Sequence, residues 1–198
     1  MWMLHNGPGN VVAASAMVLS WLGLCTVMLT ARRPPAGESA AKRDASSTFG
    51  IILQSIGIGA AWASPIRLDT DWPFPRETWI AGAPVALLAV LSLALFVWSA
   101  ATMGRNWSLI ARTRDDHKLV QDGPFALMRH PIYVAMFGLL VATALSLGHM
   151  VNLIAAIPIF LWGTLSRVAI EERLLRNAFG DAYDAYAKRV KRFIPGVW

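Results

Sequence analysis

The sequence predicts an all-α integral membrane protein, a helical bundle with about five transmembrane helices. Of its 198 residues, 56% are hydrophobic and only 15% carry a charge, a balance that soluble domains rarely reach. The apolar residues also gather into long runs, each close to the ~20 residues that a helix needs to cross about 30 Å of hydrocarbon. The length of the chain allows one domain, residues 1–198.

Five apolar runs are the predicted spans. They cover residues 11–30, 49–66, 79–103, 132–147 and 151–168. The fourth run is the shortest, and Gly148 and His149 after it indicate a tight turn, so the last two runs are expected to form a helical hairpin. The first run lacks the basic residues that precede the apolar core of a signal peptide, so we interpret it as a span.

The basic residues orient this bundle. Of the 18 Lys and Arg residues, only Arg67 and Arg76 lie outside three regions: the segment after the first run, the segment between the third and fourth runs, and the region from the end of the fifth run onward. By the positive-inside rule these regions are cytoplasmic, so the C-terminus is predicted inside and the N-terminus outside. Topology and anionic lipid explain the net charge of +6, so a lipid bilayer but no nucleic acid is the expected partner.

The first two runs exclude some kinds of site. Cys25 is the only cysteine and lies inside the first run, so the chain forms no internal disulfide and no cysteine metal site, and no metal is expected. Gly57 and Gly59 do not mark a phosphate-binding loop, because no predicted strand precedes them. Ser55, Gly59 and Ala63 recur at four-residue spacing, which predicts that this face packs closely against another helix.

The segment 104–129 is too polar for a span yet contains apolar anchors, so we expect it to fold against the membrane surface. Gly123 and Pro124 predict a turn. Pro131 suits the first turn of a helix, where its missing N–H costs nothing. His130 is therefore expected beside a helix start, where unpaired N–H groups and the positive end of the helix dipole attract anionic groups such as a carboxylate.

The end of the fifth run carries complementary charges. Arg167 and Glu171 are four residues apart and share one helix face, whereas Glu172 points about 100° away from Glu171. An ionisable residue at membrane depth indicates a functional position, and arginine can grip a carboxylate through two hydrogen bonds. The alternative is that Arg167 only extends to the membrane interface and pairs with Glu171.

The remaining tail predicts an amphipathic C-terminal helix on the cytoplasmic leaflet. Gly180 is expected to end the preceding helix and Asp181 to act as an N-cap. Tyr183 and Tyr186 then line one face. We interpret the tyrosines as anchors at the membrane interface, with the alternative that they cover a cofactor.

Five short motifs follow one another in the second half of the chain. In order, they are His117-Lys118-Leu119-Val120, Gly123-Pro124-Phe125, Arg129-His130-Pro131-Ile132-Tyr133, Glu171-Glu172, and Phe179-Gly180 followed by Tyr183 and Tyr186. This ordered combination resembles the isoprenylcysteine carboxyl methyltransferase family, whose broader group includes membrane phospholipid methyltransferases. The resemblance covers 104–195. It implies that 104–198 is the cofactor-binding and catalytic half of one membrane methyltransferase domain, residues 1–198, whose first part, 1–103, contains the three N-terminal spans.

The resemblance implies an enzyme that uses S-adenosylmethionine without a soluble Rossmann-type domain. The residues that it implies for cofactor binding, in a cytoplasmic pocket, are His117, Lys118, Leu119, Val120, Phe125, His130, Pro131, Ile132, Tyr133 and Glu171. Phe125 stands where the family often has tyrosine, so a hydroxyl is lost there while packing can persist. Arg167 is implied to contact the substrate.

The chemistry of methyl transfer agrees with this interpretation. Displacement at a sulfonium requires an acceptor aligned with the methyl group more than it requires a covalent protein intermediate. A carboxylate is already nucleophilic, so Arg167 would orient the carboxylate of an isoprenylcysteine-like or other apolar acceptor, which could enter sideways between helices. An amine acceptor would need a base to remove its proton, for which Glu172 or His130 are the candidates.

Three classes of function therefore stay open. The first is O-methylation of a carboxylate on a lipophilic acceptor, and the second is N-methylation of a phospholipid or small amine. The third is an NADPH-dependent reductase, since membrane sterol reductases resemble this group around the Arg129 to Tyr133 segment. The Glu171-Glu172 pair and the tail from Phe179 favour the methyltransferases. The lack of a targeting extension favours a bacterial inner membrane.

Overall fold

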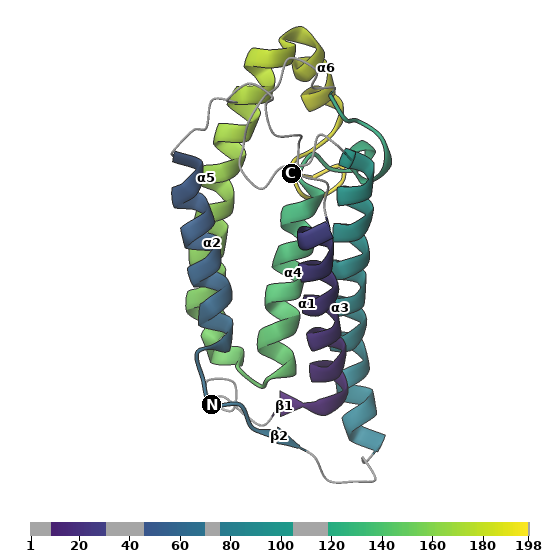
Figure 1. The fold of residues 1–198 in the computed structure, drawn as a ribbon, viewed down its shortest axis with the longest axis vertical. Coiled ribbons are helices and arrows are strands. Elements are labelled where there is room, and N and C mark those ends of the chain that lie inside the picture. Colours follow the sequence, from purple (N-terminus) through teal and green to yellow (C-terminus); the bar gives the residue numbers. More distant parts are fainter. Residues whose placement is uncertain (1–8, 31–45, 70–75, 105–118, 198) are drawn as a thin grey trace.

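The computed structural model describes residues 9–30, 46–69, 76–104 and 119–197. His117 and Lys118 lie outside these ranges. Six helices dominate the described chain (Figure 1): α1 Val11–Thr30, α2 Ser46–Trp62, α3 Arg76–Met103, α4 Pro131–Ser146, α5 Leu153–Phe179 and α6 Asp181–Arg189. The prediction of an all-α bundle is therefore confirmed.

The helix lengths match an integral membrane protein. Three segments are long and apolar enough to cross a bilayer: Val11–Thr30, Thr78–Met103 and Met150–Phe179. Helices α2 and α4 are shorter apolar helices. At about 1.5 Å per residue, the 16 residues of α4 reach only ~24 Å, less than the ~30 Å of hydrocarbon. Helix α4, which corresponds to the fourth predicted run, is thus the shortest of the five helices that correspond to predicted spans, as expected.

The helices form two groups that run side by side (Figure 1). Helix α2 lies along α5, while α3 packs against both α1 and α4. One apolar cluster fills the group of α1, α3 and α4, with Met17, Phe96 and Leu139 among its buried members. A second cluster joins the two groups and includes Leu140 of α4 and Phe160 of α5. Beyond these clusters, large apolar side chains such as Leu19, Ile52, Leu91 and Trp162 are exposed on the outer surface, as a lipid-facing surface requires.

Helices α4 and α5 form the predicted hairpin. Gly148 has a positive φ of 73°, which suits a glycine in a tight turn, and a short 3-10 helix, η3 Met150–Asn152, leads into α5. The prediction of a turn at Gly148 and His149 is confirmed. The hairpin brings the start of α4 and the end of α5 to one end of the molecule, where α6 also lies (Figure 1). We call this the α6 end.

The opposite end is closed by a pairing that the sequence did not predict. Strand β1 Gly9–Asn10 lies parallel to β2 Leu68–Asp69. The Asn10 side chain accepts a hydrogen bond from the Ala13 N–H (3.1 Å) and donates one to the Thr78 carbonyl (2.8 Å). Asn10 thus caps the start of α1 and ties it to α3.

The prediction for the packing face of α2 is wrong. Ser55 and Gly59 are exposed, and a methyl group at Gly59 would meet nothing within 4 Å. The face that contacts α5 instead carries Gly50, Gly57 and Ala61, all of which are buried. Small residues occur on both faces of this helix, so their spacing alone does not identify the one that packs.

Candidate functional site

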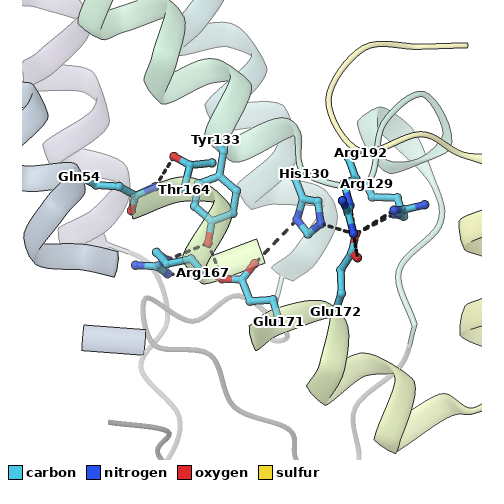
Figure 2. Close-up of polar contacts among 9 residues, drawn as sticks. All are labelled: Gln54, Arg129, His130, Tyr133, Thr164, Arg167, Glu171, Glu172 and Arg192. Atoms are coloured by element: carbon cyan, nitrogen blue, oxygen red, sulfur yellow. Dashed lines mark hydrogen bonds and ion pairs between the residues drawn. The ribbon is translucent and has the colours of Figure 1, made fainter. Parts of the chain in front are cut away.

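The candidate site lies at the α6 end, where α4 begins and α5 passes it (Figure 2). Figure 2 shows Tyr133 and His130 pointing from the start of α4 toward Arg167, Glu171 and Glu172 of α5. The hairpin therefore unites the two groups of motif residues that are far apart in the sequence. The two glutamates face different partners, because neighbouring residues of a helix point about 100° apart.

Glu171 belongs to a buried network with an arginine and a tyrosine. The Tyr133 hydroxyl donates to Glu171 Oε1 and accepts from Arg167 Nε at 2.9 Å. Arg167 Nη2 is 3.5 Å from the same carboxylate oxygen, and its guanidinium carbon lies 5.5 Å from the Tyr133 ring centroid. The Arg167 side chain is only 7% exposed. It pairs with Glu171 as the alternative expected, but it stays inside the protein and does not extend to the interface.

Glu172 is enclosed by two arginines and a histidine. Arg129 Nη2 lies 2.8 Å from Glu172 Oε1, and Arg192 Nη2 lies 2.7 Å from Oε2. Arg129 Nε and Arg192 Nε also donate to Oε1, at 3.2 and 3.0 Å. Both carboxylate oxygens are thus engaged, and the side chain is 6% exposed. Hydrogen bonding to Glu172 raises the pKa of Arg192 above its ordinary value.

His130 stands between the two carboxylates. Its Nε2 lies 3.3 Å from Glu172 Oε1 and its Nδ1 lies 3.8 Å from Glu171 Oε2. The Phe193 ring covers it, with ring centroids 5.9 Å apart. One buried imidazole therefore connects the network of Glu171 with the cluster around Glu172.

The C-terminal segment completes the start of α4. The backbone N–H groups of Arg129 and His130 donate to the carbonyls of Lys191 and Arg192, at 2.8 and 3.0 Å. The N–H of His130 at the start of α4 is therefore paired with this segment, and the expectation that an anionic group binds at this helix start stays a prediction.

Arg129 is the residue that sequence reasoning missed. Its Nη1 donates to the carbonyls of Ala187 and Val190, both at 2.8 Å, so it caps the C-terminal end of α6 while it holds Glu172. Its position inside the Arg-His-Pro-Ile-Tyr motif was the available signal. Arg192 had no such signal beyond its place in a basic run.

The tyrosines of α6 pack against the protein. Tyr183 and Tyr186 are 1% and 3% exposed, so their interpretation as interface anchors is wrong. The Tyr186 hydroxyl donates to the Phe125 carbonyl at 2.7 Å, and burial raises the pKa of Tyr186 to about 12. The Tyr183 hydroxyl is buried without a hydrogen-bond partner among the described residues. Gly180, with φ 51°, separates α5 from α6 and takes the N-cap position predicted for Asp181.

The other residues implied for cofactor binding lie at different distances from this network. Phe125 is buried in a short 3-10 helix, η2 Gly123–Ala126, and meets α6 through Tyr186. Pro131 begins α4, whereas the Ile132 side chain packs on the apolar cluster of α1, α3 and α4. Leu119 and Val120 are partly buried. The structure thus brings His130, Tyr133 and Glu171 together but not the side chain of Ile132.

A second polar pair lies one helical turn along α5 from Arg167 (Figure 2). Gln54 Nε2 of α2 donates to Thr164 Oγ1 at 2.9 Å, and both side chains are buried. In the part of the chain that the structure describes, no group of His, Cys, Asp and Glu side chains forms a candidate metal site. The site is therefore made of carboxylates, guanidinium groups, aromatic rings and this amide pair.

Comparisons with known proteins agree with the motifs. Residues 85–177 match the isoprenylcysteine carboxyl methyltransferase (ICMT) family. The chain is 37% identical over 113 residues to the protein-S-isoprenylcysteine O-methyltransferase of Schizosaccharomyces pombe, covering 54% of this chain and 48% of that protein. It is 27% identical over 161 residues to a probable enzyme of the same name from Oryza sativa subsp. indica, covering 79% and 84%. The chain thus spans about half of the first relative and most of the second.

A solved structure shares the fold. The eukaryotic intramembrane Ras methyltransferase ICMT (isoprenylcysteine carboxyl methyltransferase), solved without a monobody, superposes with a TM-score of 0.56 at 21% identity. The match covers 94% of this chain and 64% of that chain. The resemblance predicted from the motifs is therefore confirmed: residues 85–177, which carry Tyr133, Arg167 and both glutamates, match the isoprenylcysteine carboxyl methyltransferase family.

Proposed function

We propose that this protein is a membrane methyltransferase that transfers a methyl group from S-adenosylmethionine to the carboxylate of an isoprenylcysteine-like or similarly apolar acceptor. The observation that carries the proposal is the buried Arg167, which reaches the Tyr133 hydroxyl and Glu171 at the end of an apolar helix. A guanidinium held at the border of the hydrocarbon suits an acceptor that joins a carboxylate to a long apolar tail.

The residues around Glu171 fit the proposed cofactor. When bound, S-adenosylmethionine supplies an electrophilic methyl group on a positively charged sulfur. The Glu171 side chain is 23% exposed, against 6% for Glu172, so Glu171 is the carboxylate that a cationic ligand can reach. Tyr133 and His130 flank this carboxylate and fix its orientation. We assign these three residues to cofactor binding.

Arg167 would hold the acceptor carboxylate. A charge-assisted contact with two hydrogen bonds orients a carboxylate, and it is stronger where water is scarce. Because the carboxylate is already nucleophilic, orientation supplies most of what the reaction needs.

The surroundings of Glu172 argue against the amine alternative. A general base for an amine needs a carboxylate oxygen that can accept the substrate proton. Both oxygens of Glu172 accept hydrogen bonds from Arg129 or Arg192, so we assign Glu172 to holding the tail and His130 in place. The reductase alternative receives no support from the family match.

We also propose the orientation and location of the protein. The α6 end would face the cytoplasm, because most Lys and Arg residues lie in the three regions predicted to be cytoplasmic. One of these regions runs from the end of the fifth apolar run to the C-terminus and includes α6. The acceptor would enter from the bilayer, and the membrane would be a bacterial inner membrane. Residues 1–198 would act as one methyltransferase domain, with the cofactor held by its second half.

The first experiment measures methyl transfer by protein reconstituted in lipid nanodiscs. It supplies S-adenosylmethionine with a labelled methyl group and three acceptors: N-acetyl-S-farnesylcysteine, its carboxamide, and phosphatidylethanolamine vesicles. We expect a base-labile labelled product from the first acceptor alone, since the carboxamide keeps the farnesyl tail but lacks the carboxylate. Labelling of phosphatidylethanolamine alone, or binding of NADPH without binding of S-adenosylmethionine, would overturn the proposal.

The second experiment separates the proposed roles. Arg167→Ala should raise the KM for N-acetyl-S-farnesylcysteine by about 100-fold, because a charged hydrogen-bonding partner of the acceptor is lost. The Kd for S-adenosylmethionine, from equilibrium titration, should change much less. An equal loss of affinity for both ligands would contradict this division of roles.

A further inference from the structure

Helix α2 reaches the candidate site although it lies outside the family match. The match begins at residue 85, whereas α2 ends at Trp62. Nevertheless α2 is the main packing partner of α5, the helix that carries Arg167. The wall behind this arginine is therefore built by a helix that the family comparison does not describe.

The contact between α2 and Arg167 has no spare room. A methyl group added to Gly50 would overlap Arg167 Cγ and would lie 3.2 Å from Cδ and 2.9 Å from the Gly163 carbonyl oxygen. The aliphatic part of Arg167 therefore rests directly on the α2 backbone. A backbone carbonyl and a helix axis cannot shift as a free side chain can, so any added atom at position 50 must displace Arg167 or separate the helices.

The same contact is tight from the side of α5. A methyl group added to Gly163 would lie 2.7 Å from the Gly50 carbonyl oxygen and 2.9 Å from the backbone nitrogen of Gln54. The buried hydrogen bond from Gln54 to Thr164 (2.9 Å) lies next to this pair of glycines and fixes the two helices along their length. Gly50, Gly163 and the Gln54–Thr164 bond thus define where the Arg167 stem can lie.

We propose that Gly50 is a positioning residue for the acceptor: the bare backbone of α2 at this point sets the place of the Arg167 guanidinium, and α2 forms part of the acceptor site. This inference rests on the proposed function, because Arg167 is assigned there to the acceptor carboxylate. It adds a residue that acts through Arg167. It also adds a helix from the N-terminal half, which the sequence assigned only to spanning the membrane.

The chain offers two matched controls on the same helix. A methyl group at Gly57 would also be crowded, though less than at Gly50: it would lie 2.9 Å from Phe160 Cβ and 3.0 Å from the Ala156 carbonyl oxygen, and it would meet no site residue among its nearest atoms. At Gly59 it would meet nothing within 4 Å. Gly57→Ala therefore measures the stability lost when α2 and α5 are pushed apart, and Gly59→Ala measures the effect of the substitution without a steric contact.

The experiment compares Gly50→Ala, Gly57→Ala and Gly59→Ala in nanodiscs. It measures the amount of folded protein, the Kd for S-adenosylmethionine, and the kcat and KM for N-acetyl-S-farnesylcysteine. A displacement of about 1 Å at a reacting centre can reduce the rate by roughly 100-fold. We therefore expect Gly50→Ala to lower kcat/KM for the acceptor by about that factor, with cofactor Kd changed less than about threefold. Gly57→Ala should lower thermal stability but keep kcat/KM per folded molecule.

A double-variant cycle keeps the test decisive if Gly50→Ala folds poorly. Arg167→Ala removes Cγ and Cδ but leaves the contact with the Gly163 carbonyl oxygen. In that background, Gly50→Ala should therefore add no further loss of acceptor binding and should recover part of the folded protein. Equal falls in kcat/KM for Gly50→Ala and Gly57→Ala, or full additivity with Arg167→Ala, would overturn the inference alone. A wild-type protein that methylates no carboxylate acceptor would overturn the proposed function as well.

Discussion

Glu171 and Glu172 are identical neighbours with different surroundings. Glu171 faces Tyr133 and Arg167 and keeps partial access, whereas Glu172 is closed in by Arg129 and Arg192. The divergence of their directions follows from helix geometry and was predicted. The sequence did not predict which of the two glutamates stabilises the fold, because Arg192, which binds Glu172, lies in the distant C-terminal tail.

Replacing each glutamate by glutamine separates these two environments. Glu171→Gln keeps the size of the side chain but removes the charge that would face a cationic cofactor, so binding of S-adenosylmethionine should weaken by about tenfold or more. The loss of stability should be smaller than for Glu172→Gln, because only one guanidinium group, that of Arg167, loses a charged partner. Glu172→Gln leaves two guanidinium groups without their anion and should cost about 3 kcal/mol of stability. Isothermal titration and thermal unfolding in nanodiscs check the two outcomes. A reversed pattern, with Glu171→Gln unstable and Glu172→Gln stable, would contradict the assignment.

At the scale of elements, the segment after α6 holds the start of α4 in place. Its carbonyls accept hydrogen bonds from the N–H groups of Arg129 and His130, and its Arg192 binds Glu172 on α5. Three parts of the chain are thus joined at one place. The proposed cofactor site depends on this junction because His130 lies inside it.

Loss of the Arg192 side chain tests whether this segment holds the start of α4 in place. Arg192→Ala should weaken binding of S-adenosylmethionine and should expose the tail to proteolysis, because Glu172 loses one of its two arginines. Arg189→Ala is the matched control, since Arg189 donates to Gln121 at an exposed position, and it should change stability by less than about 0.5 kcal/mol. Limited proteolysis and cofactor titration measure both effects. Equal sensitivity of the two variants would argue against this role of the segment.

The turn between α4 and α5 is a second element with a separate task. His149 is buried, and its Nδ1 lies 3.1 Å from the Ala61 carbonyl, while Asn152 Nδ2 donates to the Ala60 carbonyl at 3.0 Å. The Ala61 carbonyl at the end of α2 thus gains a side-chain partner, and the Ala60 carbonyl, which also accepts the Ala63 N–H at 3.2 Å, gains a second partner. The turn ties α2 to the hairpin at the end far from the glutamates.

His149→Phe should lower stability without touching the site. Phenylalanine keeps a flat ring, slightly larger than imidazole, but a buried carbonyl loses its partner, which costs about 1–3 kcal/mol. Thermal unfolding should detect this loss, and the Kd for S-adenosylmethionine of the folded fraction should equal that of the wild type. A large change in cofactor affinity would mean that the two ends of the bundle are coupled.

At the scale of the whole molecule, the sequence predicted the helices better than the contacts between them. The five apolar runs appear as helices because run length and hydrophobicity are local properties of the chain. The fifth helix continues to Phe179 and not to 168, because its last turns are polar and carry the site, a feature that hydrophobicity cannot detect. The buried tyrosines of α6 and the pairing of β1 with β2 depend on distant partners, which a single sequence does not reveal.

The predicted topology can be tested with one cysteine at a time. Cys25 is the only cysteine, so Cys25→Ser gives a background free of thiols. In that background, Ile66→Cys should react from outside the cell with a membrane-impermeant maleimide, and Val197→Cys should react only after the membrane is opened. Both positions are exposed, at 54% and 72%. Labelling of Val197→Cys in intact cells would reverse the proposed orientation.

The bonds of Arg129 also have a consequence for the timing of synthesis. Arg129 donates to the carbonyl of Val190, 61 residues later in the chain. At roughly 5–20 residues per second, a ribosome needs several seconds to make that intervening stretch. During this interval the nascent α4 lacks the carbonyl groups of the C-terminal segment that later bind the N–H groups at its start. Assembly of the candidate site therefore waits until the α5–α6 region has been synthesised, and a prolonged pause there would leave Arg129 and His130 without Glu172 and the carbonyls that later bind them.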